Sequence, residues 1–408
     1  MHRDTPPPSP DMNEQIEDED MIYIGDVEEV IDAYDAGDIE EEDAMEEDPS
    51  EGDAICVFTG HKRGSVFCGT LSKNGKLAAT GGEEDKAYVW DTSTGEIILD
   101  CTGHKDSIIF SAFNYDESYL ATGDMSGLIQ VWKVADKIKI WDYNMGDATV
   151  MLLQWMMWHI AANVLLAGSV DGEIYMWKIP DGDCKVLQGY GCRAETGAIF
   201  PDGIHFFIFL MRIAIGYEDG VVRILDLKTN SVLSFISSTY GHSHTITTID
   251  CHSDNNLILS AAVDGKTIIS TSNTGKIVSI LQNLNNKNKE INNWVETAVF
   301  CKDPTFQVAA TGTVNGEIFI WDISKQVLRQ KITQESGISK LVWKGNTTVL
   351  FSAGLDGILR CFDGKNGQCL RSFVAHTADI LDLYISENGE KALTTSDDFT
   401  ARIFDISS

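Results

Sequence analysis

Basic residues are scarce in this chain of 408 residues, which has 31 Lys and Arg against 62 Asp and Glu and a net charge of −31 at pH 7. Such an excess of negative charge repels phosphate backbones and anionic membrane surfaces. It therefore argues against direct nucleic-acid binding and favours a basic protein or peptide as partner. The acids are concentrated at one end, because residues 1–53 hold 22 of them beside a single Arg.

Long apolar runs are also missing. The longest, Ile204–Met211, is far shorter than the roughly 20 residues that a helix needs to span a bilayer, so no transmembrane segment is expected. No apolar signal segment follows Met1, and the nine Cys form an odd number, most of them in strand-like contexts. These features predict a reducing, cytoplasmic environment.

Catalytic and metal-binding motifs are absent from the sequence as well. It has no Gly-rich phosphate loop followed by Lys-Ser or Lys-Thr, no Gly-x-Ser-x-Gly and no Cys-x-x-Cys pair. The nearest metal-like group is His242, His244 and His252 with Cys251, but zinc needs four well-placed ligands and His242 belongs to a structural Gly-His dipeptide. We expect neither an enzyme nor a cofactor or metal site.

The chain does contain a repeat. Its clearest copy, Leu165–Lys178, reads LLAGSVDGEIYMWK and encodes a hairpin in which two strands flank a Val-Asp-Gly turn. Eight copies follow one another at spacings of 41 to 51 residues. Aligned on the sixth residue after the turn Asp, they place at this position Trp90, Trp132, Trp177, Leu225, Ser270, Trp321, Phe362 and Phe404.

The repeat has the features of a propeller blade. Trp-Asp closes it at Trp90 and Trp321, and Gly-His stands upstream at His61, His104 and His242. A period of about 40 to 45 residues with these two dipeptides is typical of a four-stranded WD40 blade. We therefore predict an all-β, eight-bladed WD40 β-propeller over residues 54–408, monomeric and preceded by a disordered acidic region over residues 1–53.

Some of the polar residues of a blade are expected to be structural. His, a strand Ser or Thr, Asp and Trp meet at one end of a blade, where they can form a buried hydrogen-bond chain. The residues assigned to this framework are Trp90, Trp132, Trp177, Trp321, His61, His104, His242, Asp171, Asp219, Asp264 and Asp356.

The two ends of the repeat array are predicted to meet. Ile55–Thr59 resembles an outer strand with no inner strands before it, while the last repeat stops after Phe404 without an outer strand. Pairing the two completes the last blade and removes two exposed edges.

Three repeats depart from the pattern. Ser270 replaces the aromatic residue of blade 5, so neighbours must fill its place or the blade is looser, and Asn283–Asn293 has the composition of a surface loop. His205–Leu210, HFFIFL, is surplus to blade 4. It is either a partner-binding bulge or sequence wrongly retained in the gene model, since exposed apolar segments of this kind favour aggregation.

The residue before the turn Asp is the predicted binding position. It mixes acids, Glu83, Glu218 and Asp397, with apolar residues in the other blades, and all should lie at one end of the propeller. Together with the nearby Glu84, Asp124 and Asp398 they form a predicted acidic face for a basic, amphipathic peptide. The alternative is that these are ordinary solvated turn residues.

Region 1–53 leaves two interpretations open. An apolar thread between Ile22 and Tyr34 could dock on a partner or on the propeller, or the whole region is a solubilising tail.

Individual motifs go beyond a general WD repeat. GGEEDKAYVW at Gly81–Trp90, ATGDMSGL at Ala121–Leu128 and LLAGSVDGEIYMWKIPDGDCK at Leu165–Lys185 closely resemble the angio-associated migratory cell protein family, as does the acidic N-terminal region. The resemblance implies a non-catalytic, cytoplasmic WD-repeat protein. It also implies one of two functions: a chaperone that holds a basic large-subunit ribosomal protein, as in the fungal counterpart, or a signalling scaffold in cell migration and angiogenesis.

Overall fold

The propeller forms its own unit, Ser50–Ser408, apart from a unit over Met1–Pro49. The computed structural model describes residues 52–146, 153–187, 189–201, 212–282 and 294–407. The predictions for the acidic region before residue 52, for His205–Leu210 and for the loop 283–293 lie outside the described residues. No helix of the described residues is long and apolar enough to cross a membrane.

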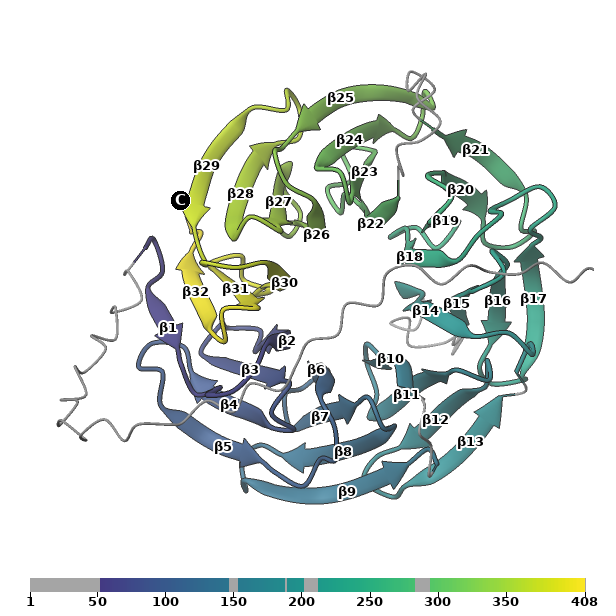
Figure 1. Ribbon diagram of the computed structural model, residues 1–408. Helices are drawn as coiled ribbons and strands as arrows, with labels where there is room; N and C mark the ends of the chain where they lie inside the picture. Colours follow the sequence, from purple (N-terminus) through teal and green to yellow (C-terminus); the bar gives the residue numbers. More distant parts are fainter. Residues whose placement is uncertain (1–51, 147–152, 188, 202–211, 283–293, 408) are drawn as a thin grey trace, which may run out of the picture. The chain divides into compact units, whose positions relative to one another are not determined.

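Eight four-stranded antiparallel sheets surround a central axis (Figure 1), which confirms the predicted eight-bladed propeller. The strands nearest the axis are β2 (Val66–Leu71), β6 (Ile108–Phe113), β10 (Leu153–Trp158), β14 (Ala194–Ile199), β18 (Ile246–Cys251), β22 (Val295–Phe300), β26 (Ile338–Trp343) and β30 (Ile380–Ile385). The second strands are β3 (Leu77–Gly82), β7 (Tyr119–Asp124), β11 (Val164–Ser169), β15 (Arg212–Tyr217), β19 (Leu257–Ala262), β23 (Val308–Thr313), β27 (Val349–Gly354) and β31 (Lys391–Ser396).

The remaining strands form the outer half of each blade. The third strands are β4 (Ala87–Asp91), β8 (Leu128–Lys133), β12 (Ile174–Lys178), β16 (Val222–Asp226), β20 (Thr267–Thr271), β24 (Glu317–Asp322), β28 (Ile358–Asp363) and β32 (Ala401–Asp405). The outermost are β5 (Ile97–Cys101), β9 (Ile138–Asn144), β13 (Asp183–Leu187), β17 (Ser231–Ile236), β21 (Ile277–Leu281), β25 (Val327–Thr333), β29 (Cys369–Val374) and β1 (Cys56–Phe58). Trp141-Asp142, a Trp-Asp pair out of phase with the repeats, lies on the outer strand β9.

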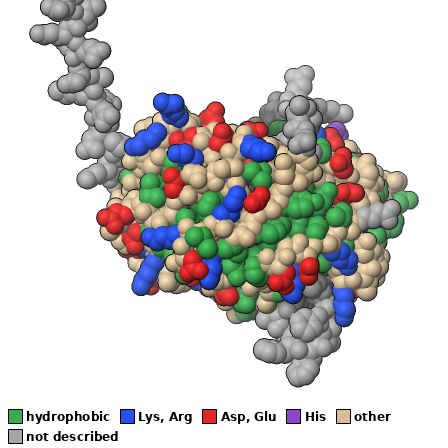
Figure 2. All heavy atoms as spheres, turned by 90° about the horizontal axis from the view of Figure 1, so that it is seen from below, with side chains coloured by type: hydrophobic (Ala, Val, Ile, Leu, Met, Phe, Trp, Pro, Cys, Tyr) green, Lys and Arg blue, Asp and Glu red, His purple; other side chains and the backbone are tan. Residues whose placement is uncertain are grey.

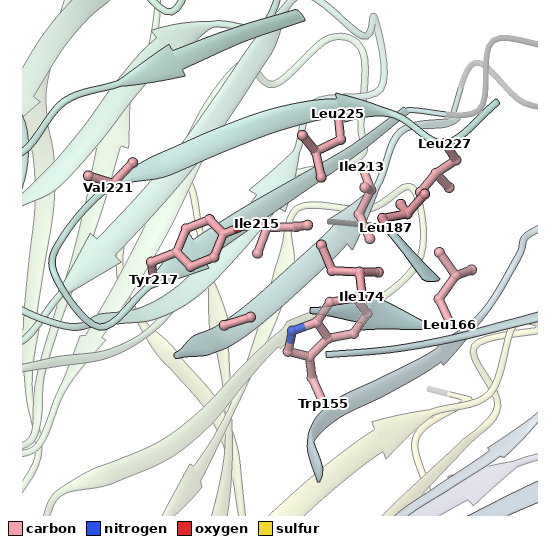
Figure 3. Packing of buried hydrophobic residues seen from close by; sticks show 11 residues of the cluster. Trp155, Leu166, Ile174, Leu187, Ile213, Ile215, Tyr217, Val221, Leu225 and Leu227 are labelled. Atoms are coloured by element: carbon pink, nitrogen blue, oxygen red, sulfur yellow. The ribbon is translucent and has the colours of Figure 1, made fainter. Parts of the chain in front are cut away.

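The core lies between the blades, where each sheet packs its faces against its two neighbours. Figure 3 shows the packing between blades 3 and 4, in which Trp155 meets Ile213 and Ile215. Several second strands have Gly where the first residue of the next inner strand packs against them, as Ile108 does at Gly81 and Ile246 at Gly216. A Cβ on Gly123 would lie 2.5 Å from Leu153 Cδ2, so only glycine allows this approach.

Ser270 is fully buried in blade 5, and a neighbouring blade supplies the missing aromatic ring. Phe200, which directly follows the inner strand of blade 4, is also fully buried and packs with Ile258 and Ile277 of blade 5. Apolar neighbours thus surround Ser270, whose buried hydroxyl has no hydrogen-bond partner among the described residues.

The ring closes as predicted. β1 pairs with β32 in the register Cys56 to Ile403 and Phe58 to Ala401, which gives the last blade its outer strand. The Phe58 ring then stacks on Trp90 of blade 1, with centroids 4.6 Å apart and planes 3° from parallel. One short strand therefore joins the first blade to the last.

We predict that Phe58→Ala lowers the free energy of unfolding by about 3–5 kcal/mol, because Phe58 is only 2% exposed and its removal leaves a cavity at the closure. Urea unfolding followed by Trp fluorescence measures the loss. Ile55→Ala is the control, because Ile55 lies directly before β1 and its side chain is 52% exposed. It should change the free energy of unfolding by less than about 0.5 kcal/mol. Equal effects of the two substitutions would show that the stacked ring does not hold the closure.

Candidate functional site

The predicted binding residues do lie at one end of the propeller. In seven blades the backbone N–H of this residue donates to the carbonyl group just before an inner strand, as Glu83 does to Ser65 at 2.9 Å and Glu218 to Arg193 at 3.0 Å. The other residues that make this bond are Met125, Val263, Val314, Leu355 and Asp397. We call this end, where the inner strands begin, the Gly-His end.

Buried hydrogen-bond chains lie inside the blades directly beneath the turns of the Gly-His end. In blade 8, His376 Nε2 lies 2.7 Å from Thr394 Oγ1 and Nδ1 lies 2.9 Å from Asp398 Oδ2. His61 with Thr80, His104 with Thr122 and His242 with Ser260 repeat the first contact in blades 1, 2 and 5. The indole N–H groups of Trp90, Trp132 and Trp321 donate to the strand Thr of their own blades.

Three of the acids predicted on the binding face belong to these chains instead. Asp124 accepts from His104 and from the backbone of Lys105 and Leu128, and its side chain is fully buried. The Asp398 side chain is 6% exposed, and Glu84, 14% exposed, pairs with His61 at 3.2 Å. The prediction that Asp124 and Asp398 lie on the exposed binding face is wrong, because each carboxylate is buried in contact with a buried His. Glu84 is largely buried by the same kind of contact, with His61.

Burial and hydrogen bonding oppose each other at these carboxylates. Desolvation alone would raise the pKa of Asp398, but hydrogen bonds from His376, Thr400 and the Thr377 backbone bring this pKa well below its usual range. Burial lowers the pKa of His376 in turn, although the Asp398 carboxylate counteracts part of this shift. The carboxylate is therefore held as an anion inside the blade.

The four Asp residues assigned to the framework divide. Asp264 contacts His242 at 3.3 Å and accepts from the Ser243 backbone, and Asp356 forms an ion pair with Arg360 at 2.6 Å. Asp219 is exposed and accepts a local bond from the Val221 backbone at 3.1 Å. It also lies near the Tyr190 hydroxyl, whose pKa is raised by burial and by the Asp219 charge. Asp171 is exposed, so the structure does not bury it as predicted.

Blade 7 uses a substitute that has no Gly-His signal. Gln334 occupies the place of His, and its side-chain amide donates to Ser352 Oγ at 2.7 Å. The Arg360 guanidinium donates both to the side-chain oxygen of Gln334 and to Asp356. The spacing to the strand Ser could have identified it, since Gln334 to Ser352 equals His376 to Thr394.

Two exposed carboxylates remain together where blades 8 and 1 meet. Glu83 Oε2 accepts from the Ser65 backbone at 3.1 Å, and the Ser65 hydroxyl donates to Asp397. Ser65 thus holds both side chains at the Gly-His end, and both residues are exposed. We call Glu83 and Asp397 the first acidic pair.

A second pair lies in blade 4, across the ring (Figure 1). Glu218 is exposed in the β15–β16 turn, and Glu195 is the extra residue of a β-bulge at the start of β14. Burial raises the pKa of Glu195, and the negative charge of Glu218 adds to this while Arg193 opposes it. We call Glu195 and Glu218 the second acidic pair.

Glu296 in blade 6 is a fifth carboxylate at this end. It occupies the same bulge position on β22, is accessible to solvent, and has its pKa raised by desolvation. Glu195 and Glu296 were missed from the sequence because a bulge turns a side chain in a way that strand alternation does not reveal.

Among the described residues, no group of three His, Cys, Asp or Glu side chains is arranged to hold a metal ion. His242 precedes β18 and His252 follows it, so the metal-like group of the sequence is divided between opposite ends of a strand. All nine Cys are free thiols.

Comparison with known proteins agrees with this architecture. The family described as WD domain, G-beta repeat, matches residues 52–91, 95–133, 233–269 and 367–405. The human angio-associated migratory cell protein is 38% identical over 361 residues, which cover 86% of this chain and 80% of that protein, and the dog protein matches equally well. The chain belongs to the angio-associated migratory cell protein family.

More distant members of the WD-repeat class share the fold. The ribosome assembly protein SQT1 of Saccharomyces cerevisiae is 22% identical over 412 residues, covering 90% of each chain. A crystal structure of Chaetomium thermophilum Sqt1, bound to the N-terminus of the ribosomal protein L10, superposes with a TM-score of 0.74 at 21% identity, over 87% of this chain and 100% of that one.

The buried carboxylates predict a pH dependence for this family member. Because folding lowers the pKa of Asp398, its contribution to stability is present above the unfolded-state pKa of about 4 and is lost as the pH falls below it. We expect Asp398→Asn to cost about 1–3 kcal/mol at pH 7 and to flatten the stability profile between about pH 5 and pH 2. Urea unfolding across this range is the measurement.

Asp397→Asn is the matched control for this experiment, because its side chain is exposed beside the same turn. It should leave the profile within about 0.5 kcal/mol of the unmodified protein. Parallel profiles for Asp398→Asn and the unmodified protein would contradict the buried-anion interpretation.

Proposed function

We propose that this protein is a non-catalytic binding protein that escorts a basic ribosomal protein by holding an extended segment of it across the Gly-His end. The observation that carries the proposal is the two acidic pairs, which stand on opposite sides of the ring at the same end of the propeller. A segment with Lys or Arg at both ends would meet a carboxylate pair at each side.

The geometry favours a basic side chain over a neutral one. Glu195 and Glu296 are partly shielded from water, and this desolvation raises the pKa of each carboxyl. A cationic side chain of a partner would stabilise the ionised carboxylates in place of the missing water. Binding is therefore expected to lower both pKa values and to weaken as salt screens the carboxylates.

The similarity to fungal proteins supports a ribosomal client. One such protein is named a ribosome assembly protein, and another was crystallised bound to the N-terminus of the ribosomal protein L10. A free ribosomal protein is basic because it binds rRNA, so an acidic surface would shield it until assembly. We place this role in the cytoplasm, with a one-to-one complex of monomers.

The second function, a scaffold in cell migration, is supported by the name of the relatives that are 38% identical. None of the described surface residues gives it a specific site. Affinity purification at low and high salt distinguishes the two functions. If the protein is an escort, a ribosomal protein co-purifies at low salt and is lost at high salt; if it is a scaffold, motility proteins co-purify instead.

We predict that the combined substitution Glu83→Lys, Glu218→Lys and Asp397→Lys weakens binding of the L10 N-terminal peptide at least tenfold and reduces the dependence of the Kd on salt. Fluorescence anisotropy with the labelled peptide at several salt concentrations is the measurement. The framework residues are untouched, so the variant should fold.

The matched control places the same change in charge at the opposite end of the propeller. Glu96, Glu387 and Glu390 are exposed in turns at the far end of β4 and β30, and their substitution by Lys should leave the Kd within about twofold. Equal weakening by both triple variants would mean that only net charge matters, and unchanged binding in the first would overturn the proposed site.

A further inference from the structure

The outer rim of the propeller is protected unevenly. An outermost strand leaves one row of backbone groups unpaired, and proteins commonly place charged residues on such edges to prevent unwanted pairing. β5, β9, β13, β25 and β29 each carry at least one charged residue. On the side of the ring that carries β5 and β9, Figure 2 shows hydrophobic side chains interspersed with charged ones.

Blades 4 and 5 are different, and among the described outermost strands only the three-residue β1, CVF, shares their lack of charge. β17 reads SVLSFI and β21 reads IVSIL, so neither contains a charged residue. Their large apolar side chains are nevertheless exposed, with Phe235 at 59%, Val232 at 42% and Ile280 at 47%. An uncharged apolar edge of this kind is typical of an interaction surface.

A β-bulge concentrates apolar side chains on one face of blade 4. Ile224 pairs with Ser234 but Leu225 pairs with Val232, which leaves Leu233 as the extra residue. The bulge turns Val232 to the same face as Phe235, so that Val232 lies opposite Leu225 and Phe235 lies opposite Arg223. Without it, strand alternation would point the two apolar side chains in opposite directions.

The groove at this face has room for side chains of a partner. Two adjoining hollows, of about 250 and 360 Å³, share Tyr190, Arg223 and Val232 in their lining, and Phe235 and Val221 extend the larger one. Val221 and Leu225 belong to the rigid core between blades 3 and 4 (Figure 3), so the floor is preformed. We call this surface the blade 4 groove.

Arg223 is the charged residue among the described side chains that line the groove, and its environment differs from that of its counterparts. Arg360 and Arg402 stand at the same place in blades 7 and 8, four residues after the turn Asp. Each meets that Asp, at 2.6 Å for Arg360 with Asp356 and at 3.9 Å for Arg402 with Asp398.

The counterpart of these Asp residues in blade 4, Asp219, accepts a bond from the Val221 backbone and lies near the Tyr190 hydroxyl. Among the described ion pairs, none joins Asp219 to Arg223 within 4 Å. The guanidinium of Arg223 lies instead over the Tyr190 ring, 4.8 Å from its centroid. Its planar fork is thus left without the carboxylate that the same position has in two other blades.

We propose that the blade 4 groove is a second docking surface, which binds an extended segment of a partner in which one Asp or Glu is flanked by apolar residues. The carboxylate pairs with Arg223, the apolar side chains occupy the two hollows beside Val232 and Phe235, and the segment runs along the free edge of β17. Its preference for an acidic segment is opposite to that of the Gly-His end, so it serves a different partner or a different part of one.

The test uses the full chain and two labelled peptides, one with a single Glu between Val and Phe and one with Gln in place of this Glu. We expect the Glu peptide to bind at least tenfold more tightly by fluorescence anisotropy, and Arg223→Gln to abolish this difference. Phe235→Ser should weaken both peptides, and because Phe235 is largely exposed this variant should fold. Equal binding of the two peptides would overturn the proposal.

Arg329→Gln is the matched control. Arg329 also lies on the rim over an aromatic ring, 4.9 Å from the centroid of Phe306, but it has a carboxylate partner in Asp322. It should leave both affinities unchanged, and a loss equal to that of Arg223→Gln would overturn the assignment of the groove. The triple Lys variant of Glu83, Glu218 and Asp397 should still bind the Glu peptide, so the groove can be tested separately from the proposed escort function.

Sedimentation velocity tests whether the blade 4 groove binds a second copy of the chain instead of a partner segment. If the unmodified protein dimerises with rising concentration and Phe235→Ser prevents this, the groove is a self-association surface and the proposal is wrong. A monomer at all concentrations, together with preferential binding of the Glu peptide, supports the proposal.

Discussion

Face-to-face packing of neighbouring sheets is the interaction on which this structure depends. Each blade buries both faces only if it has a neighbour on each side, so the ring is stable only when the first and last blades also meet. The three residues of β1 satisfy this requirement by pairing with β32 and stacking Phe58 on Trp90. The short strand therefore has an influence on stability out of proportion to its length.

The same packing decides which polar residues can act on a partner. The buried His side chains at the Gly-His end need hydrogen-bond acceptors. His104 and His376 take theirs from a turn carboxylate, which removes Asp124 and Asp398 from the surface. The carboxylates of the two acidic pairs and Glu296 lie one residue earlier in the turns or on the bulges of the inner strands. The proposed binding surface at the Gly-His end therefore consists of carboxylates that the buried framework does not use.

Blade 4 carries part of both proposed docking surfaces, and the preferences proposed for them are opposite. Its Gly-His end presents Glu195 and Glu218, whereas its rim presents Arg223 in an apolar groove. Both depend on a β-bulge, one on β14 and one on β17, because a bulge redirects a side chain without a change in the rest of the strand. An escort with two such surfaces could hold a basic segment and an acidic segment at the same time.

The sequence by itself determined the eight blades, the closing strand and the family, because Trp-Asp, Gly-His and the turn Asp recur at a regular spacing and each has a local structural cause. It also located the end of the propeller that carries Glu83, Glu218 and Asp397. Only the tertiary structure decided that Asp124 is buried, that Gln334 replaces a His, that Glu195 and Glu296 join the acidic end, and that Arg223 lacks the carboxylate of its counterparts. These features arise from bulges and from contacts between strands distant in sequence, and a repeat pattern cannot show which of two adjacent side chains turns inward.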